Sequence, residues 1–178
     1  MKITVIGGGS TYSPELVGGF LERTATLPVQ ELWLMDIDPA RLEIVGGFIR
    51  RMVAAAGNPF SVRLTDDREQ AIREASYVVT QLRIGKMAAR REDEYLGQRH
   101  GLIGQETTGV GGMAKALRTI PVIRDIAEGM RRLAPGAVLA NFTNPAGLIT
   151  QSLIDIFPAG EGIGVSVSWF KEYLFRPD

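Results

Sequence analysis

Short apolar runs alternate along this chain with longer stretches in which apolar residues recur at helical spacing. The short runs are rich in β-branched residues, which is typical of buried strands. We predict such strands at residues 2–6, 32–35, 60–65, 77–82 and 137–142, and a sixth at residues 162–167.

The stretches between these runs carry helix start signals, which are polar N-caps followed by proline. Ser13 is the expected N-cap of the first helix, and Asp38 that of the second. Further helices are expected at residues 68–74, 87–98, 113–133 (with Pro121 interrupting the pattern) and 145–157. Strands alternating with helices predict an α/β fold, with a doubly wound parallel sheet, strand order 3-2-1-4-5-6 and right-handed crossovers.

A glycine-rich turn separates the first strand from the first helix. It consists of Gly7, Gly8, Gly9, Ser10 and Thr11. Glycine allows a tight turn and lets a pyrophosphate approach the backbone, and the helix start behind it offers unpaired N–H groups. The turn therefore indicates a Rossmann-like dinucleotide site. The alternative is a glycine turn that binds nothing.

The second strand ends in Asp36, which is placed to accept hydrogen bonds from both hydroxyls of a ribose. A carboxylate there repels a 2′-phosphate, so NAD is favoured over NADP. Tyr12 stands where the usual G-x-G-x-x-G pattern has its third glycine. This departure predicts a first helix that lies further from the sheet, or a longer turn.

Composition excludes several classes of protein. The 178 residues include 20 basic and 20 acidic side chains, giving zero formal net charge, so no nucleic-acid or membrane partner is indicated. Cysteine is absent, which excludes disulfides and thiolate metal sites. No apolar run approaches the roughly 18 residues of a membrane span, and the first strand begins at once, without a signal-peptide layout. We therefore expect a cytoplasmic protein.

Arginines follow the fourth strand. Arg83 lies in a loop that faces the cofactor, because ligands bind beyond the carboxyl ends of such strands. Arg90 comes seven residues later and Arg91 follows it. Arginine suits a phosphate group. The alternative is a solvated helix face paired with Glu92 and Glu94.

A segment with five glycines, residues 100–112, reads as a long loop and is therefore a candidate functional segment. Its Glu106 could orient substrate hydroxyls or be a solvated acid. His100, the only histidine, could be a base or simply exposed. After the fifth strand, Asn144 precedes Pro145, and its amide could bind a carboxamide or a sugar hydroxyl, or cap the next helix.

Taken together, these motifs resemble the N-terminal half of a family 4 glycoside hydrolase, nearest to its 6-phospho-β-glucosidases. The resemblance rests on the glycine turn, Asp36, Arg83-Ile84-Gly85 with Arg90, the run from Gly104 to Gly112, and Asn144-Pro145-Ala146. It covers roughly residues 1–165, and the run after Gly104 is its most specific part.

The resemblance implies hydrolysis of a 6-phospho-glycoside through hydride abstraction by NAD+, elimination, water addition and hydride return, with a divalent metal such as Mn2+ as Lewis acid. It implies that Gly7, Gly9 and Ser10 hold the pyrophosphate and that Asp36 holds the adenosine ribose. Arg90 would bind the 6-phosphate. Glu106 and Asn144 would contact the sugar, with Asn144 also near the nicotinamide.

The chain departs from the family at its C-terminal end. Ser166 occupies the position expected for a metal-ligating cysteine, and the histidine ligand and tyrosine base are expected in a second, missing domain. We therefore expect an NAD-binding domain at residues 1–168 and an atypical tail at residues 169–178. No catalytic residue or metal ligand is expected in this chain, which would bind NAD without hydrolysing glycosides.

Other readings remain. A lactate/malate-type dehydrogenase has a related nucleotide domain, and a stand-alone NAD-binding module would do no chemistry. The apolar tail residues Trp169, Phe170, Leu174 and Phe175 predict self-association into a homo-oligomer.

Overall fold

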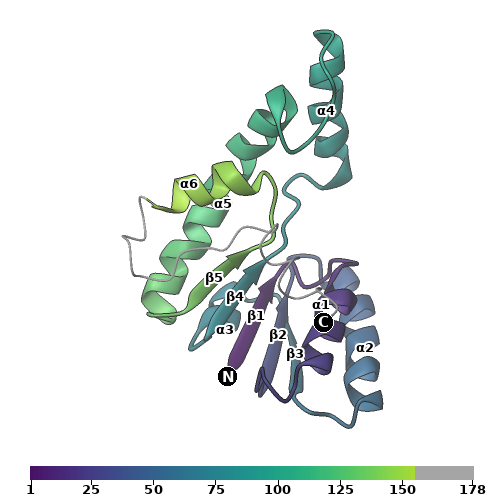
Figure 1. Ribbon diagram of the computed structural model, residues 1–178, viewed down its shortest axis with the longest axis vertical. Helices are drawn as coiled ribbons and strands as arrows, with labels where there is room; N and C mark the ends of the chain where they lie inside the picture. Colours follow the sequence, from purple (N-terminus) through teal and green to yellow (C-terminus); the bar gives the residue numbers. More distant parts are fainter. Residues whose placement is uncertain (155–178) are drawn as a thin grey trace.

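The computed structural model describes residues 1–154. It contains a five-stranded, all-parallel sheet in the order β3-β2-β1-β4-β5 (Figure 1). The strands are β1 (Lys2–Ile6), β2 (Glu31–Met35), β3 (Ser61–Thr65), β4 (Tyr77–Thr80) and β5 (Val138–Asn141). This order confirms the doubly wound α/β prediction for the first five strands. The predicted sixth strand, Ser166 and the tail lie outside the described residues.

Helices cover both faces of the sheet, as a doubly wound connection requires. Helices α1 and α2 lie on one face, and α3, α5 and α6 on the other (Figure 1). The helices are α1 (Ser13–Glu22), α2 (Pro39–Ala55), α3 (Arg68–Ile72), α4 (Lys86–Arg99), α5 (Gly109–Leu133) and α6 (Ala146–Ile154).

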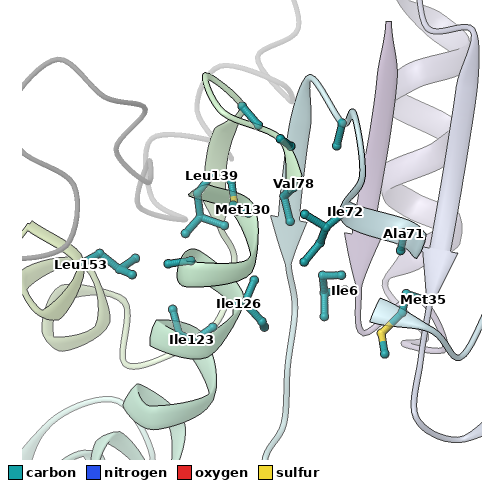
Figure 2. Close-up of a cluster of buried hydrophobic side chains, with 14 of the residues drawn as sticks. Ile6, Met35, Ala71, Ile72, Val78, Ile123, Ile126, Met130, Leu139 and Leu153 are labelled. Carbon is teal, nitrogen blue, oxygen red and sulfur yellow. The ribbon is translucent and has the colours of Figure 1, made fainter. Parts of the chain in front are cut away.

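Each face of the sheet has its own apolar core, because successive strand residues point to opposite faces. Val79 of β4 packs with Val17 and Phe20 of α1, whereas the preceding Val78 packs on the α5 side with Ile126. Figure 2 shows the second core, with α5 side chains lying between the sheet and Leu153 of α6. The two cores fix the sheet between its helices and so fix the edge at which the strands end.

One of the two predicted N-caps is wrong. Ser13 is the first residue of α1 rather than its N-cap; Tyr12 holds that position without a side-chain hydrogen bond. The Ser13 hydroxyl is buried and donates to the Gly8 carbonyl oxygen at 2.8 Å, so it serves the glycine turn instead of the helix end. By contrast, Asp38 caps α2 as predicted, accepting from the Arg41 N–H at 3.2 Å.

The glycine-rich segment is shorter as a loop than the sequence suggested. Helix α5 begins at Gly109 and runs unbroken past Pro121 to Leu133. The reason is close packing: a Cβ on Gly111 would lie 2.2 Å from the Gln105 carbonyl oxygen. Gly111 therefore allows the loop backbone to lie against the first turn of the helix, which outweighs its low helix propensity.

Helix α4 and the first part of α5 form an arm that extends from the sheet beyond the carboxyl ends of the strands (Figure 1, top). Within this arm α4 packs on α5. The connection from β4 into α4 turns at Gly85, which has φ +81°. The arm thus begins at the edge of the sheet where the sequence places a ligand.

Candidate functional site

The glycine turn between β1 and α1 is bound to the end of β2. The N–H groups of Gly7 and Gly8 both donate to the Met35 carbonyl oxygen, at 2.9 and 2.8 Å. A Cβ on Gly8 would lie 2.7 Å from the Leu34 Cβ, closer than real side chains approach. Gly7 has φ +91°, which favours glycine. The turn therefore requires glycine for its own packing, whatever it binds.

Asp36 lies beside this turn. Its Oδ2 accepts from the Gly9 N–H at 2.9 Å, and its Oδ1 accepts from the Asp38 N–H at 3.0 Å. Arg41 completes the contact by donating from Nε to the Gly9 carbonyl oxygen at 2.6 Å. The structure thus brings the predicted turn and the predicted acid together, and it adds Arg41, which the sequence analysis missed.

Gln81 and Ser13 are two further residues that the sequence analysis missed at this turn. The Gln81 side-chain amide donates to the Gly7 carbonyl oxygen at 3.1 Å and to the Ser13 hydroxyl at 2.6 Å. Together they join the end of β4 to the start of α1. The available signal was a polar residue within the last two positions of the predicted strand at residues 77–82, at the edge where the glycine turn also lies.

Tyr12 lies between the glycine turn and the first residue of α1. Its side chain is 55% exposed and its ring meets Phe142 edge-on, with the centroids 6.2 Å apart. The next residue, Ser13, is fully buried and within hydrogen-bond distance of the turn. The start of α1 is therefore bound to the glycine turn, although Tyr12 stands at the position of the third glycine.

A polar network joins the carboxyl ends of β4 and β5. The buried Asn141 accepts from the Thr80 hydroxyl at 2.9 Å, and the Thr143 hydroxyl accepts from the Leu82 N–H at 2.8 Å. Asn144 follows this network and is partly buried. Because α6 begins at Ala146, Asn144 lies two residues before the helix, and no side-chain cap by it is seen.

Three cations surround Glu106, in what we call the cation cluster (Arg83, Arg90 and Lys115). The Glu106 Oε2 accepts from Arg83 Nη1 at 2.5 Å and from Lys115 Nζ at 2.9 Å, and Arg90 Nε lies 3.7 Å from it. Arg90 also pairs with Glu94 at 2.8 Å. Two of the three predicted arginines, Arg83 and Arg90, therefore converge on the predicted glutamate, although Arg83 lies outside α4.

Charge in this cluster is unevenly balanced. Burial raises the pKa of Glu106, but the hydrogen bonds from Lys115 and Arg83 outweigh it, and the pKa lies below its ordinary value. The Lys115 side chain is only 4% exposed, and its burial lowers its pKa despite the Glu106 partner. With Glu94 included, three positive charges face two negative ones, so the arrangement favours an additional anion.

The sequence analysis did not single out Lys115, because this residue lies on a helix with an ordinary amphipathic pattern. Each of the two alternatives for the arginines holds in part. Arg90 pairs with Glu94, as expected for a solvated helix face, but it also faces Glu106. Arg91 instead pairs with Glu92 on the surface, with the Nε and Oε1 atoms 3.8 Å apart. The Glu106 side chain is only 14% exposed, so Glu106 is not a freely solvated acid of the loop.

A second ion pair lies next to the cation cluster. Arg118 of α5 makes a two-pronged contact with Asp93 of α4, with Nη1–Oδ1 2.9 Å and Nη2–Oδ2 2.5 Å. The Asp93 side chain is only 3% exposed. This fork holds α4 against α5.

The remaining predicted site residues stand apart. His100 and Thr11 are exposed, and His100 follows the last residue of α4. Ser10 lies in the turn, where its hydroxyl accepts from the Tyr12 N–H at 3.2 Å. Residues 1–154 contain no group of three or more His, Asp or Glu side chains suited to a metal ion. In the same range, no helix combines the length and apolar character needed to cross a membrane.

Comparisons with known proteins identify the family of the chain. A sequence profile described as Family 4 glycosyl hydrolase matches residues 2–170 of the chain. The chain is 52% identical over 156 residues to the probable 6-phospho-β-glucosidase of Bacillus subtilis, covering 86% of this chain and 35% of that protein. It is 47% identical over 155 residues to the 6-phospho-β-glucosidase of Escherichia coli, covering 86% and 34%. The chain thus spans about a third of the length of these relatives.

A solved structure of the Thermotoga maritima 6-phospho-β-glucosidase, with manganese, NAD+ and glucose-6-phosphate, superposes with a TM-score of 0.86 at 36% identity, covering 97% of this chain and 43% of that one. Malate dehydrogenase from Salinibacter ruber superposes with a TM-score of 0.63 at 15% identity, covering 98% and 50%. That second likeness shows a shared fold and no more. The match over residues 2–170 shows that this chain belongs to family 4 of the glycosyl hydrolases.

Proposed function

We propose that this chain forms the nucleotide-binding part of an NAD- and divalent-metal-dependent 6-phospho-glycosidase, of the 6-phospho-β-glucosidase type. The observation that carries the proposal is the position of Asp36 beside the glycine turn, with the cation cluster beyond the same edge of the sheet. The named relatives, and the NAD+ and sugar phosphate held by the Thermotoga maritima protein, support it.

The residues of the turn fit NAD. The turn leads directly into α1, whose first N–H groups have no partner within the helix and so suit a pyrophosphate. Asp36 lies at the end of β2 with its carboxylate 2.9 Å from the Gly9 N–H, and it would take the adenosine ribose. When bound, NAD+ supplies hydride transfer, and the chain's contribution is to hold and orient it.

Asn144 and Arg83 complete the proposed cofactor contacts. Both follow strands that end at this edge of the sheet, β5 and β4, which supports the proposal that they lie near the nicotinamide end of the cofactor. Asn144, together with Glu106, is proposed to contact sugar hydroxyls, because amide and carboxylate groups can orient hydroxyls through hydrogen bonds.

The cation cluster is the proposed phosphate site. Arg90 is 36% exposed in its side chain and carries a guanidinium fork that suits phosphate, whereas Lys115 is buried and bound to Glu106. We therefore assign the 6-phosphate to Arg90. Residues 1–154 contain no group of three or more His, Asp or Glu side chains suited to a metal ion, which supports a divalent metal that takes ligands from elsewhere in the enzyme.

A calorimetric titration of the 178-residue chain tests the cofactor proposal. We expect micromolar NAD+ binding and much weaker NADP+ binding, because the Asp36 carboxylate repels a 2′-phosphate. In Asp36→Ser, the ratio of the NADP+ dissociation constant to the NAD+ dissociation constant should fall at least tenfold. Failure of the chain to bind either dinucleotide would contradict the proposal.

The phosphate proposal has a neighbouring control. In the presence of NAD+, Arg90→Met should weaken glucose 6-phosphate binding about tenfold or more, since hydrogen bonds to charged groups contribute about 1.5–3 kcal/mol. Arg91→Met removes an adjacent arginine whose ion-pair partner among residues 1–154 is the surface Glu92, and it should leave the affinity unchanged. Equal effects of the two substitutions would refute the assignment to Arg90.

A further inference from the structure

Arg118 contacts the supports of both arginines in the cation cluster. Its guanidinium makes the fork to Asp93, which lies three residues after Arg90 on α4. Its Nε also lies 3.4 Å from the carbonyl oxygen of Ile84, the residue that follows Arg83. A single side chain of α5 therefore touches the backbone next to one arginine and the helical turn that carries the other.

Arg118 also packs against the turn that leads into α4. A Cβ on Gly85 would lie 3.5 Å from the Arg118 Nε, so the turn into α4 lies directly against the guanidinium. Arg118 Nη1 also donates to the Ala114 carbonyl oxygen of its own helix at 3.3 Å. The guanidinium is thus held from α5 while it fixes both the turn and α4.

Arg118 and Lys115 form two parallel attachments between the helices. They are three residues apart on α5 and therefore neighbours on its surface. Lys115 holds Glu106, on which Arg83 and Arg90 converge, and Arg118 holds Asp93. Among the described residues no hydrogen bond or ion pair joins Arg118 to Glu106, so we expect an effect on the cation cluster to pass through the positions of Arg83 and Arg90.

We infer that Arg118 is a positioning residue for the phosphate site: its fork to Asp93 and its contact with the Ile84 carbonyl set Arg83 and Arg90 around Glu106. The inference rests on the proposed function in so far as the anion bound there is a sugar phosphate. Lysine cannot replace this role, because a single ammonium cannot make the fork and reach the Ile84 carbonyl together.

The experiment compares three variants of the 178-residue chain: Arg118→Met, Arg118→Lys and, as control, Arg132→Met. Arg132 makes an exposed pair with Glu69 at 2.9 Å, so its loss removes an arginine–carboxylate contact away from the cluster. Each variant is titrated with NAD+ and, in the presence of NAD+, with glucose 6-phosphate. The pKa of the Glu106 carboxyl is followed by NMR without ligand.

For Arg118→Met we expect glucose 6-phosphate binding to weaken about tenfold or more, with NAD+ affinity kept within about twofold. The Glu106 pKa should rise toward its ordinary value, because Arg83 moves away from it. Arg118→Lys should weaken glucose 6-phosphate binding and raise the Glu106 pKa in the same way but by less. Arg132→Met should change neither quantity.

A Glu106 pKa and a sugar phosphate affinity that both stay at the wild-type values would overturn the inference. If Arg118→Met does not fold, the lysine variant decides by the same criteria. If the wild-type chain binds NAD+ but no glucose 6-phosphate, the proposed phosphate site is wrong. The positioning role of Arg118 is then tested only by the Glu106 pKa in the two Arg118 variants: a raised pKa supports the role, and an unchanged pKa overturns it.

Discussion

The glycine turn and the cation cluster lie beyond the same edge of the sheet but are held in place by different forces. The turn is fixed by backbone contact: Gly7 and Gly8 share the Met35 carbonyl oxygen, and Gly8 lies directly on Leu34. The cluster is fixed by charge, with Lys115 and Arg83 bound to one carboxylate oxygen. The turn should therefore be sensitive to added volume and the cluster to changes of charge and pH.

Adding one methyl group to the turn should have the largest effect. In Gly8→Ala the new Cβ would lie 2.7 Å from the Leu34 Cβ and 2.9 Å from its Cα, and the strand backbone cannot move away. We expect a loss of about 3 kcal/mol in the free energy of unfolding, measured by urea denaturation, together with loss of NAD+ binding.

Gly18→Ala is the matched control in the adjoining helix. A Cβ there meets no atom within 4 Å among the described residues, so the substitution should stabilise the chain by about 0.5–1 kcal/mol through helix propensity. Comparable losses from Gly8→Ala and Gly18→Ala would show that the turn is not specially packed.

Removing the central charge of the cluster should have a smaller but clear effect. In Glu106→Gln the Lys115 ammonium stays buried beside Arg83 and Arg90 without a counter-ion. We expect a loss of about 2 kcal/mol at pH 7 in the same denaturation experiment, since an uncompensated buried charge is costly. Glu92→Gln changes a surface carboxylate paired with Arg99 and should cost less than about 1 kcal/mol. A Glu106→Gln variant as stable as Glu92→Gln would disprove the charge-held cluster.

Acid should produce the smallest of the three effects. The Glu106 pKa is lowered in the folded chain, so its stabilising contribution is complete above the unfolded value of about 4.3 and is lost as the pH falls through the folded value. The stability difference between wild type and Glu106→Gln should therefore shrink below about pH 4. A difference that stays constant from pH 7 down to pH 3 would exclude this contribution of Glu106.

Local signals were enough to predict much of the fold. Apolar runs identified the strands, and the caps at Asp38 and Asp67 lie where polar residues precede helices α2 and α3. The prediction failed for the start of α5 because the sequence shows the glycines but not the loop backbone that packs against them, the Gln105 carbonyl on Gly111 and the Thr107 carbonyl on Gly112. It failed at Ser13 because the hydroxyl found a tertiary partner, the Gly8 carbonyl.

For the site, the sequence alone determined the glycine turn, the acid at the end of β2 and the family resemblance, because these depend on residue types at fixed local spacing. It could not show that Glu106, Arg83 and Arg90 meet, that Lys115 binds Glu106, or that Arg118 binds Asp93 beside them. Nor could it show that Gln81 and Arg41 bind the glycine turn. Those contacts join different elements of the fold. Only the tertiary structure decides them, because the distance between side chains on separate elements depends on how the sheet, α4 and α5 pack.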